Sequence, residues 1–177
     1  MMENKLPGSN LPEPWLRATW SQVPAVPRAV LHALEMASED VKCWCGGLTD
    51  DEINARPAGI PPVAFHIRHI ARSLDRLLTY AEGNSLTSEQ LAGLRTELDP
   101  ALKSRELFAE LASAIDKSAL RIRAFNVANL EESRSIGKKQ LPSTVGGLLV
   151  HVADHTQRHV GQAITTAKIV VATRRPA

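Results

Sequence analysis

The stretch HVADHTQRHVGQ, residues 151–162, decides how the rest of the chain is interpreted, because a histidine recurs there at every fourth position. On an α-helix that turns about 100° per residue, His151, His155 and His159 fall within a stripe roughly 80° wide, with Gln162 inside it. Two imidazoles one turn apart have Cβ atoms about 5–6 Å from each other and can share a divalent ion when both are neutral. The alternative is a polar helix edge whose histidines are solvated or hydrogen-bonded.

Outward from this stretch, hydrophobic residues recur with a period near 3.6, which predicts four principal helices. The expected helices span residues 27–46, 61–83, 104–127 and 142–173. No strand-like alternation, hairpin dipeptide or internal repeat is evident, so we expect residues 129–141 to form a polar loop. The predicted fold class is all-α, a four-helix bundle with long connections.

The connections contain two short helix signals. Asp50 to Ala55 is expected to form one short turn of helix. Thr87 to Gln90 fits a capping box, T-x-x-Q, and predicts a helical turn within the crossover that follows Gly83.

The first 26 residues are rich in proline and are expected to form an N-terminal arm, while residues 27–177 form the bundle domain. Trp15, Leu16 and Trp20 are spaced so that a short helix would turn them inward. We therefore expect the arm to pack on the body of the protein.

Length and charge restrict the class of protein. A chain of 177 residues suits one domain that buries about 70% of its unfolded surface. The net charge is +2, and no run of lysine or arginine exceeds two residues, which argues against a nucleic-acid partner. No apolar segment resembles a signal peptide or approaches 18 residues, so we expect a cytoplasmic protein without a membrane partner.

A second source of histidine lies on the helix expected over residues 61–83, where His66 and His69 share the shoulder of the buried face. Facing helices of a bundle hold side chains at fixed separation, so two helices together can build a metal site. Three neutral imidazoles would leave coordination positions open to water, as in catalytic sites. Imidazole ligands alone do not distinguish zinc, nickel, copper and iron.

From about residue 25 to 170 the chain resembles the DinB/YfiT-like superfamily of helical-bundle metalloproteins. The resemblance is carried by FHIRHIARSLDRLL on residues 65–78 and by HVADHTQRHVGQ on residues 151–162. It implies that His69, His155 and His159 bind a divalent metal such as nickel or zinc. The usual ending of the last motif in that family resembles H-H-R-G-Q, whereas this chain has R-H-V-G-Q at residues 158–162. The ligand position is retained, and the neighbouring histidine is not.

A simple helical wheel favours His66 over His69 as the ligand, because His66 lies nearer the centre of the apolar face. The resemblance favours His69, and we follow it. His66, His151 and Gln162 are then expected beside the metal, where they line a pocket or contact a ligand. Gly161 is expected to permit close packing of helices.

The resemblance implies a metal-dependent enzyme that acts on a small-molecule substrate. Relatives in the superfamily include transferases and an isomerase that use a low-molecular-weight thiol, so we expect a thiol S-transferase-like reaction or a hydrolase. The alternative is a non-enzymatic metal-binding or stress-associated protein in which the ion ties two helices together. The family also makes a homodimer the expected assembly.

Overall fold

The computed structural model describes residues 12–100 and 103–174 and is mostly helical, with a small two-stranded sheet. The helices are α1 (Ala25–Cys45), α2 (Asp50–Asn54), α3 (Val63–Ala81), α4 (Ser88–Arg95), α5 (Ser104–Ala124) and α6 (Val145–Ala172). Short 3₁₀ turns occur at Pro14–Leu16, Pro57–Gly59 and Val127–Asn129. The predicted helices are therefore present, each within a few residues of its expected bounds.

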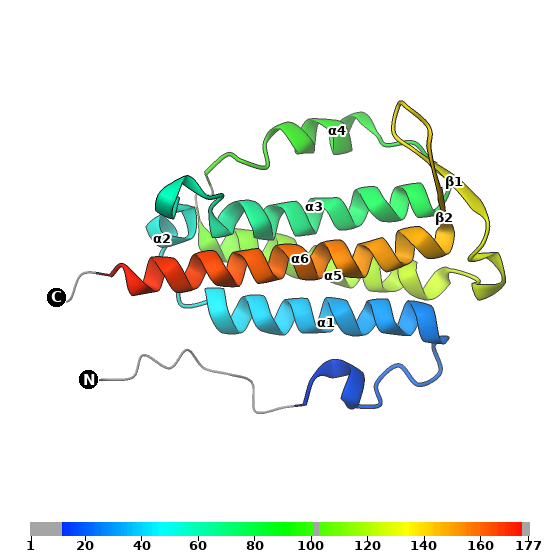
Figure 1. Cartoon of the computed structure of the whole chain (residues 1–177), viewed down its shortest axis with the longest axis horizontal. Coiled ribbons are helices and arrows are strands. Elements are labelled where there is room, and N and C mark those ends of the chain that lie inside the picture. Colours follow the sequence, from blue (N-terminus) through cyan, green and yellow to red (C-terminus); the bar gives the residue numbers. More distant parts are fainter. Residues whose placement is uncertain (1–11, 101–102, 175–177) are drawn as a thin grey trace.

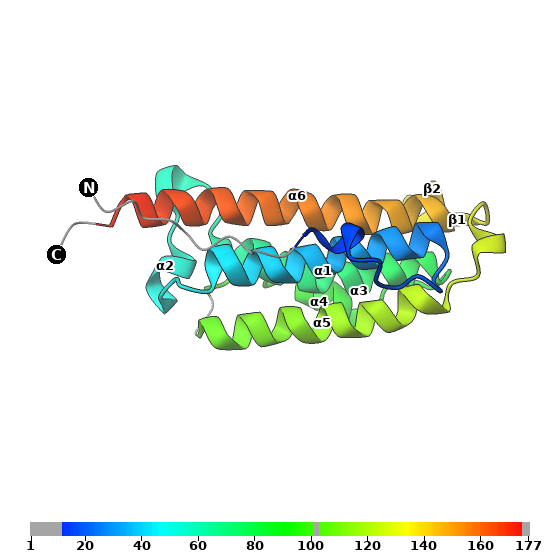
Figure 2. The same ribbon diagram turned by 90° about the horizontal axis from the view of Figure 1, so that it is seen from below.

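The four long helices lie side by side and share one hydrophobic core (Figures 1 and 2). Each of α1 and α3 contacts both α5 and α6, so every long helix has two long neighbours. The helices α3 and α6 run in opposite directions along their contact (Figure 1). Burial of their apolar faces supplies the main stabilisation of this arrangement.

Side-chain caps fix where several helices begin. Thr144 caps α6 by accepting a hydrogen bond from the backbone N–H of Gly147 at 3.0 Å. Thr87 and Gln90 form the predicted capping box of α4, and Thr49 forms another at the start of α2. These caps satisfy backbone donors that have no partner within the helix.

The expected loop at residues 129–141 is wrong. Strands β1 (Ser133–Ile136) and β2 (Leu141–Thr144) pair antiparallel, with Ser133 opposite Thr144 and Ile136 opposite Leu141. The turn between them places Gly137 and Gln140 at positive φ, +67° and +51°. The strands are four residues long and no residue in them is fully buried, so they lack the hydrophobic alternation by which a strand is recognised. The all-α expectation needs this correction.

Residues 12–24 run along α1 and are tied to it by polar contacts. Arg17 pairs with the carboxylate of Glu39, with Nη2 at 2.7 Å from Oε2, and Trp20 Nε1 donates to Glu35 Oε1 at 2.7 Å. Trp15 and Leu16 are exposed, so the expectation that they turn inward is wrong, whereas Trp20 is partly buried against the core. Residues 1–11 of the predicted arm lie outside the described residues, and the division into arm and domain stays a prediction.

None of the helices that the structure describes combines the length and apolarity needed to cross a lipid bilayer.

Leu149 and its neighbour Val150 test the core of α6. Leu149 is fully buried and Val150 is exposed. We expect Leu149→Ala to lower the free energy of unfolding by about 2–5 kcal/mol through lost burial and a cavity. Val150→Ala should change it by about 0.5 kcal/mol or less. Urea unfolding followed by circular dichroism measures both, and equal effects would contradict the assigned faces of α6.

Candidate metal centre

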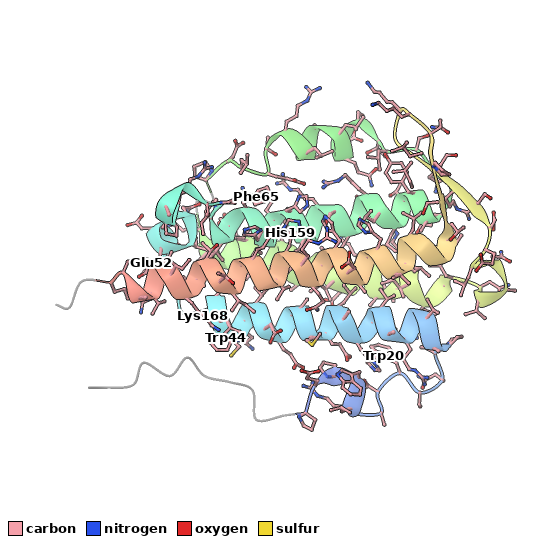
Figure 3. The ribbon with its side chains drawn as sticks, viewed as in Figure 1. Trp20, Trp44, Glu52, Phe65, His159 and Lys168 are labelled. Atoms are coloured by element: carbon pink, nitrogen blue, oxygen red, sulfur yellow. The ribbon has the colours of Figure 1, made fainter. Side chains whose placement is uncertain are left out.

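Three histidines from two helices converge where α3 crosses the middle of α6. One nitrogen each from His69 on α3 and from His155 and His159 on α6 lies within 4.8 Å of the other two. The Nε2 atoms of His69 and His155 are 3.2 Å apart. Figure 3 places His159 on the side of α6 that faces α3. Among the described residues, no other group of three histidine, cysteine or acidic side chains is close enough to hold an ion.

The antiparallel contact of α3 with α6 sets this convergence. Successive turns of the two helices meet in reverse order, so His69 faces His155 while His66 faces His159. The spacing of four residues between His155 and His159 keeps both on one side of α6, with ring centroids 4.7 Å apart. The structure therefore brings together the three histidines that the resemblance implied.

The Nδ1 atom of each of these three rings faces a partner outside the cluster. His69 Nδ1 is 2.6 Å from Glu97 Oε2, and His155 Nδ1 is 3.4 Å from Ser73 Oγ. His159 Nδ1 is 3.1 Å from His66 Nδ1. An ionised carboxylate only accepts, so His69 carries its proton on Nδ1 and turns the lone pair of Nε2 toward His155.

The donor set and spacing fit a divalent metal. Two imidazole nitrogens bound at 2.0–2.1 Å to a tetrahedral ion are about 3.3 Å apart, close to the separation of His69 Nε2 and His155 Nε2. The hydroxyl of Ser73 donates to the backbone oxygen of Ile70 at 3.1 Å, which leaves its oxygen to accept from His155 Nδ1. With both protons on Nδ1, two Nε2 lone pairs face each other, and a cation between them removes their repulsion.

Glu97 is the functional residue that the sequence did not reveal. Its side chain is 5% exposed and accepts from Arg76 Nη1 at 2.7 Å in addition to its contact with His69. Arg68 Nη1 donates to the backbone oxygens of Glu97 and Asp99, which fixes the segment that carries the carboxylate. Burial disfavours the charged carboxylate, but hydrogen bonds from His69 and Arg76 outweigh it and lower the pKa of Glu97.

Burial keeps three of these histidines neutral. Burial is the main cause, and the neighbouring imidazoles act in the same direction; together they lower the pKa of His66, His155 and His159 to about 4. A neutral imidazole is the form that binds a metal ion. At pH 7 these three rings therefore need no deprotonation before they bind.

The remaining predicted residues are divided between the cluster and its surroundings. His66 is buried and its Nδ1 contacts His159 of the cluster. His151 is 44% exposed and its Nδ1 lies 3.8 Å from Asp154, but its ring centroid is 5.3 Å from that of His155, so it lies at the exposed edge of the cluster. An added Cβ at Gly161 would meet nothing within 4 Å, so the expectation that Gly161 permits close helix packing is wrong.

A pocket of about 690 Å³ adjoins the histidines. His66 and His159 form part of its wall, together with Phe65, Gly161 and Gln162. The ring of Phe65 stacks on His69 with centroids 5.3 Å apart and an interplanar angle of 22°. The predicted pocket residue Gln162 thus lies where a molecule next to the histidines would contact it.

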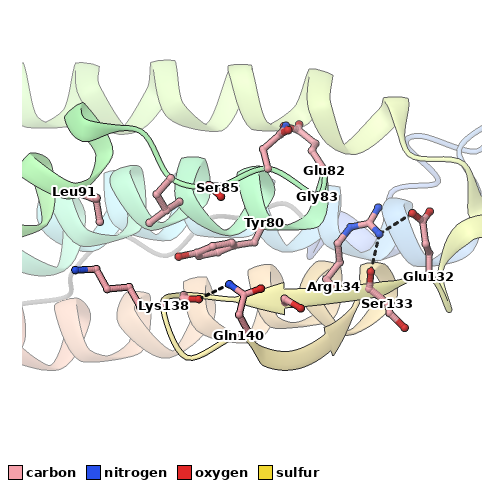
Figure 4. A pocket seen from close by; sticks show the side chains of 14 residues that line it. Tyr80, Glu82, Gly83, Ser85, Leu91, Glu132, Ser133, Arg134, Lys138 and Gln140 are labelled. Atoms are coloured by element: carbon pink, nitrogen blue, oxygen red, sulfur yellow. Dashed lines mark hydrogen bonds and ion pairs between the residues drawn. The ribbon is translucent and has the colours of Figure 1, made fainter.

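Another pocket, of about 680 Å³, lies between the hairpin and the end of α3, and no histidine lines it. Figure 4 shows its Arg134 bound to Glu132 and to the backbone of Ser133. Arg134 also donates to the backbone oxygen of Ala81 at 2.8 Å. The guanidinium of Arg134 is thus committed to structural contacts within this pocket.

The fold and the site define a helical protein with a candidate three-histidine metal centre between two long antiparallel helices. The family model of the DinB superfamily matches residues 33–163, and the chain belongs to this superfamily. The structure is similar to the crystal structure of a conserved protein from Enterococcus faecalis, with a TM-score of 0.69 and 19% identity. That match covers 85% of this chain and 99% of the other, and it shows a shared fold. A comparison with curated proteins found no significant match.

The lowered pKa values predict how the stability of the metal-free protein depends on pH. In the unfolded chain, His66, His155 and His159 bind protons near pH 6.5, whereas in the folded protein they bind them near pH 4. The free energy of unfolding should therefore be highest above pH 6.5 and fall as the pH decreases toward 4. Urea unfolding of chelator-treated protein across this range measures the effect.

The control is the double variant His155→Gln, His159→Gln, which removes two of the three histidines whose pKa is lowered. Its stability should vary less with pH than that of the wild type. Equal pH dependence in the two proteins would contradict the assignment.

Proposed function

We propose that the protein binds a divalent metal ion through His69, His155 and His159 and uses it as an enzyme acting on a small molecule. The observation that carries the proposal is the convergence of three imidazole nitrogens whose rings each have a separate partner at Nδ1. Such partners fix ring orientation and tautomer in metal sites. In this proposal the four long helices form a four-helix bundle of the DinB/YfiT-like type.

The ion is proposed to be nickel or zinc, and it supplies Lewis acidity that ionises a water or a thiol near neutral pH. The protein supplies the geometry. Glu97 accepts a hydrogen bond from Nδ1–H of His69 and so makes Nε2 of that ring a stronger electron-pair donor to the ion. The burial of Glu97 between His69 and Arg76 holds the carboxylate in place.

The pocket beside His159 supports an enzyme over a purely structural role. Its volume suits a small molecule, and the ring of Phe65 gives it an apolar wall next to the histidines. The polar groups of Gln162 and Thr165 lie in the same pocket and are available to orient a substrate. The two reactions proposed are thiol S-transfer, with a low-molecular-weight thiol as cofactor, and hydrolysis.

A second candidate is a non-enzymatic metal-binding or stress-associated protein. The feature that favours it is that the three histidines come from two helices, one from α3 and two from α6. An ion bound there would join two helices and stabilise the folded state whether or not it took part in a reaction.

Metal content tests the binding proposal. Untagged wild-type protein should contain close to one ion per chain by plasma mass spectrometry, and His69→Ala, His155→Ala and His159→Ala should each lose it. His151→Ala is the matched control from the same helix and should retain the ion. Metal retained in all four variants, or absent from folded wild type, would refute the site.

Glu97→Gln keeps the size of the side chain and removes its charge. We expect it to weaken metal affinity by about tenfold to a hundredfold without abolishing binding, because the His69 ring loses its charged acceptor. Competition with a chromogenic chelator measures the affinity. Glu89→Gln, on exposed α4, is the control with the same chemical change, and an equal effect of the two variants would exclude a role for Glu97.

The enzyme and the structural alternative differ in what the ion does. An enzyme should turn over thiol–electrophile or ester substrates only when loaded with metal, and substitution of Gln162 in the pocket should alter KM at unchanged metal content. The structural alternative predicts no turnover together with a large loss of thermal stability on chelation. Activity assays run beside differential scanning calorimetry separate the two.

The proposal further assigns the protein a cytoplasmic location, a small-molecule substrate, and no nucleic-acid or membrane partner. A homodimer is also proposed, and sedimentation velocity of the untagged protein tests it.

A further inference from the structure

A charged pocket of about 550 Å³ lies away from the metal centre, between α3, α4 and α5. Its basic side chains are Arg72, Arg76, Lys117 and Arg121, and three acidic side chains share the lining. Two of the basic groups are already neutralised within the pocket. Arg72 Nε pairs with Glu110 at 3.0 Å, and Arg121 Nη1 pairs with Asp75 at 2.7 Å.

The other two basic groups keep unused donors. Arg76 is 7% exposed, and its guanidinium has five N–H donors. Among the described residues its side chain has a single acceptor, Glu97 Oε1. Lys117 is exposed and has no hydrogen-bond or ion-pair partner within the part of the chain that the structure describes.

Ser118 supplies a hydroxyl that is available to a ligand in this pocket. It is 2% exposed, lines the pocket, and its hydroxyl has no hydrogen-bond partner among the described residues. Hydroxyls on the neighbouring α3 behave differently, because Ser73 donates to Ile70 O at 3.1 Å and Thr79 donates to Asp75 O at 2.8 Å. Among the described residues, Glu35 Oε2 is the one fully buried side-chain atom without a partner, so the oxygen of Ser118 is accessible from the pocket and can contact a ligand there.

We propose that this pocket binds a small molecule through a carboxylate held by Arg76, Lys117 and Ser118. A guanidinium presents paired N–H groups that match a carboxylate, and a serine hydroxyl donates to the same group. Lys117 is the one basic side chain of the lining without a partner among the described residues, so its ammonium group is available to the carboxylate.

Arg76 connects this pocket with the histidine cluster. It lines the pocket and donates to Glu97 Oε1, while Glu97 Oε2 lies 2.6 Å from His69 Nδ1. A carboxylate bound to the free nitrogens of Arg76 competes with Glu97 for the guanidinium. The ion pair between Arg76 and Glu97 is then weaker, and the hydrogen bond between Glu97 and His69 changes with it. This link rests on the proposed metal centre, whereas carboxylate binding does not.

The test is calorimetric titration of the chelator-treated protein with succinate, succinamide and inorganic phosphate. We expect saturable binding of succinate and no binding of the uncharged succinamide. Lys117→Gln and Ser118→Ala should each weaken succinate binding by about tenfold through loss of one charge-assisted hydrogen bond. Lys139→Gln, an exposed lysine of the hairpin turn, should bind succinate as the wild type does.

Absence of saturable succinate binding, equal affinity in all these variants, or binding of phosphate in place of succinate would overturn the proposal. Because Lys117 is exposed, its variant is expected to fold normally and remains informative if Ser118→Ala is unstable. The titrations contain no metal, so their result is independent of whether the histidines bind an ion. A separate chelator competition with and without succinate measures the link to His69.

Discussion

The antiparallel packing of α3 on α6 is the constraint on which the rest of the site depends. Their buried apolar faces fix the rotation of each helix and the register between them. A slip of one residue on an α-helix turns a side chain by about 100° and would separate His69 from His155. The energy that holds the histidines together is therefore hydrophobic, although the contacts among the rings are polar.

The sequence alone was sufficient to predict the elements that follow a periodic or local pattern. The 3.6-residue period of the long helices and the capping box at Thr87 were confirmed, because local rules determine them. The relation of His69 to His155 came from the family motif, since the helical wheel alone favoured His66. The structure accommodates both observations: His66 is the more buried residue, and His69 is the one that faces His155.

The parts that were missed depend on contacts between segments distant in sequence. Glu97 lies in a polar crossover with no periodic pattern, and its role arises when Arg68 and Arg76 draw that crossover onto α3. The hairpin at residues 133–144 consists of short strands whose side chains are largely exposed, so it has no hydrophobic signature. Neither feature has a signal in a single sequence, because a tertiary contact selects the conformation.

The position of Gly161 shows how a substitution could reshape the pocket next to His159. It lies in the middle of α6, where glycine is less favourable than alanine by about 1 kcal/mol, and no neighbouring atom requires the small residue. Its open side forms part of the pocket next to His159. An added Cβ there meets no atom within 4 Å, so a small side chain would enter the pocket without displacing its neighbours. A single-codon change at this position therefore offers evolution, or an engineer, a way to alter the range of molecules admitted without loss of folding.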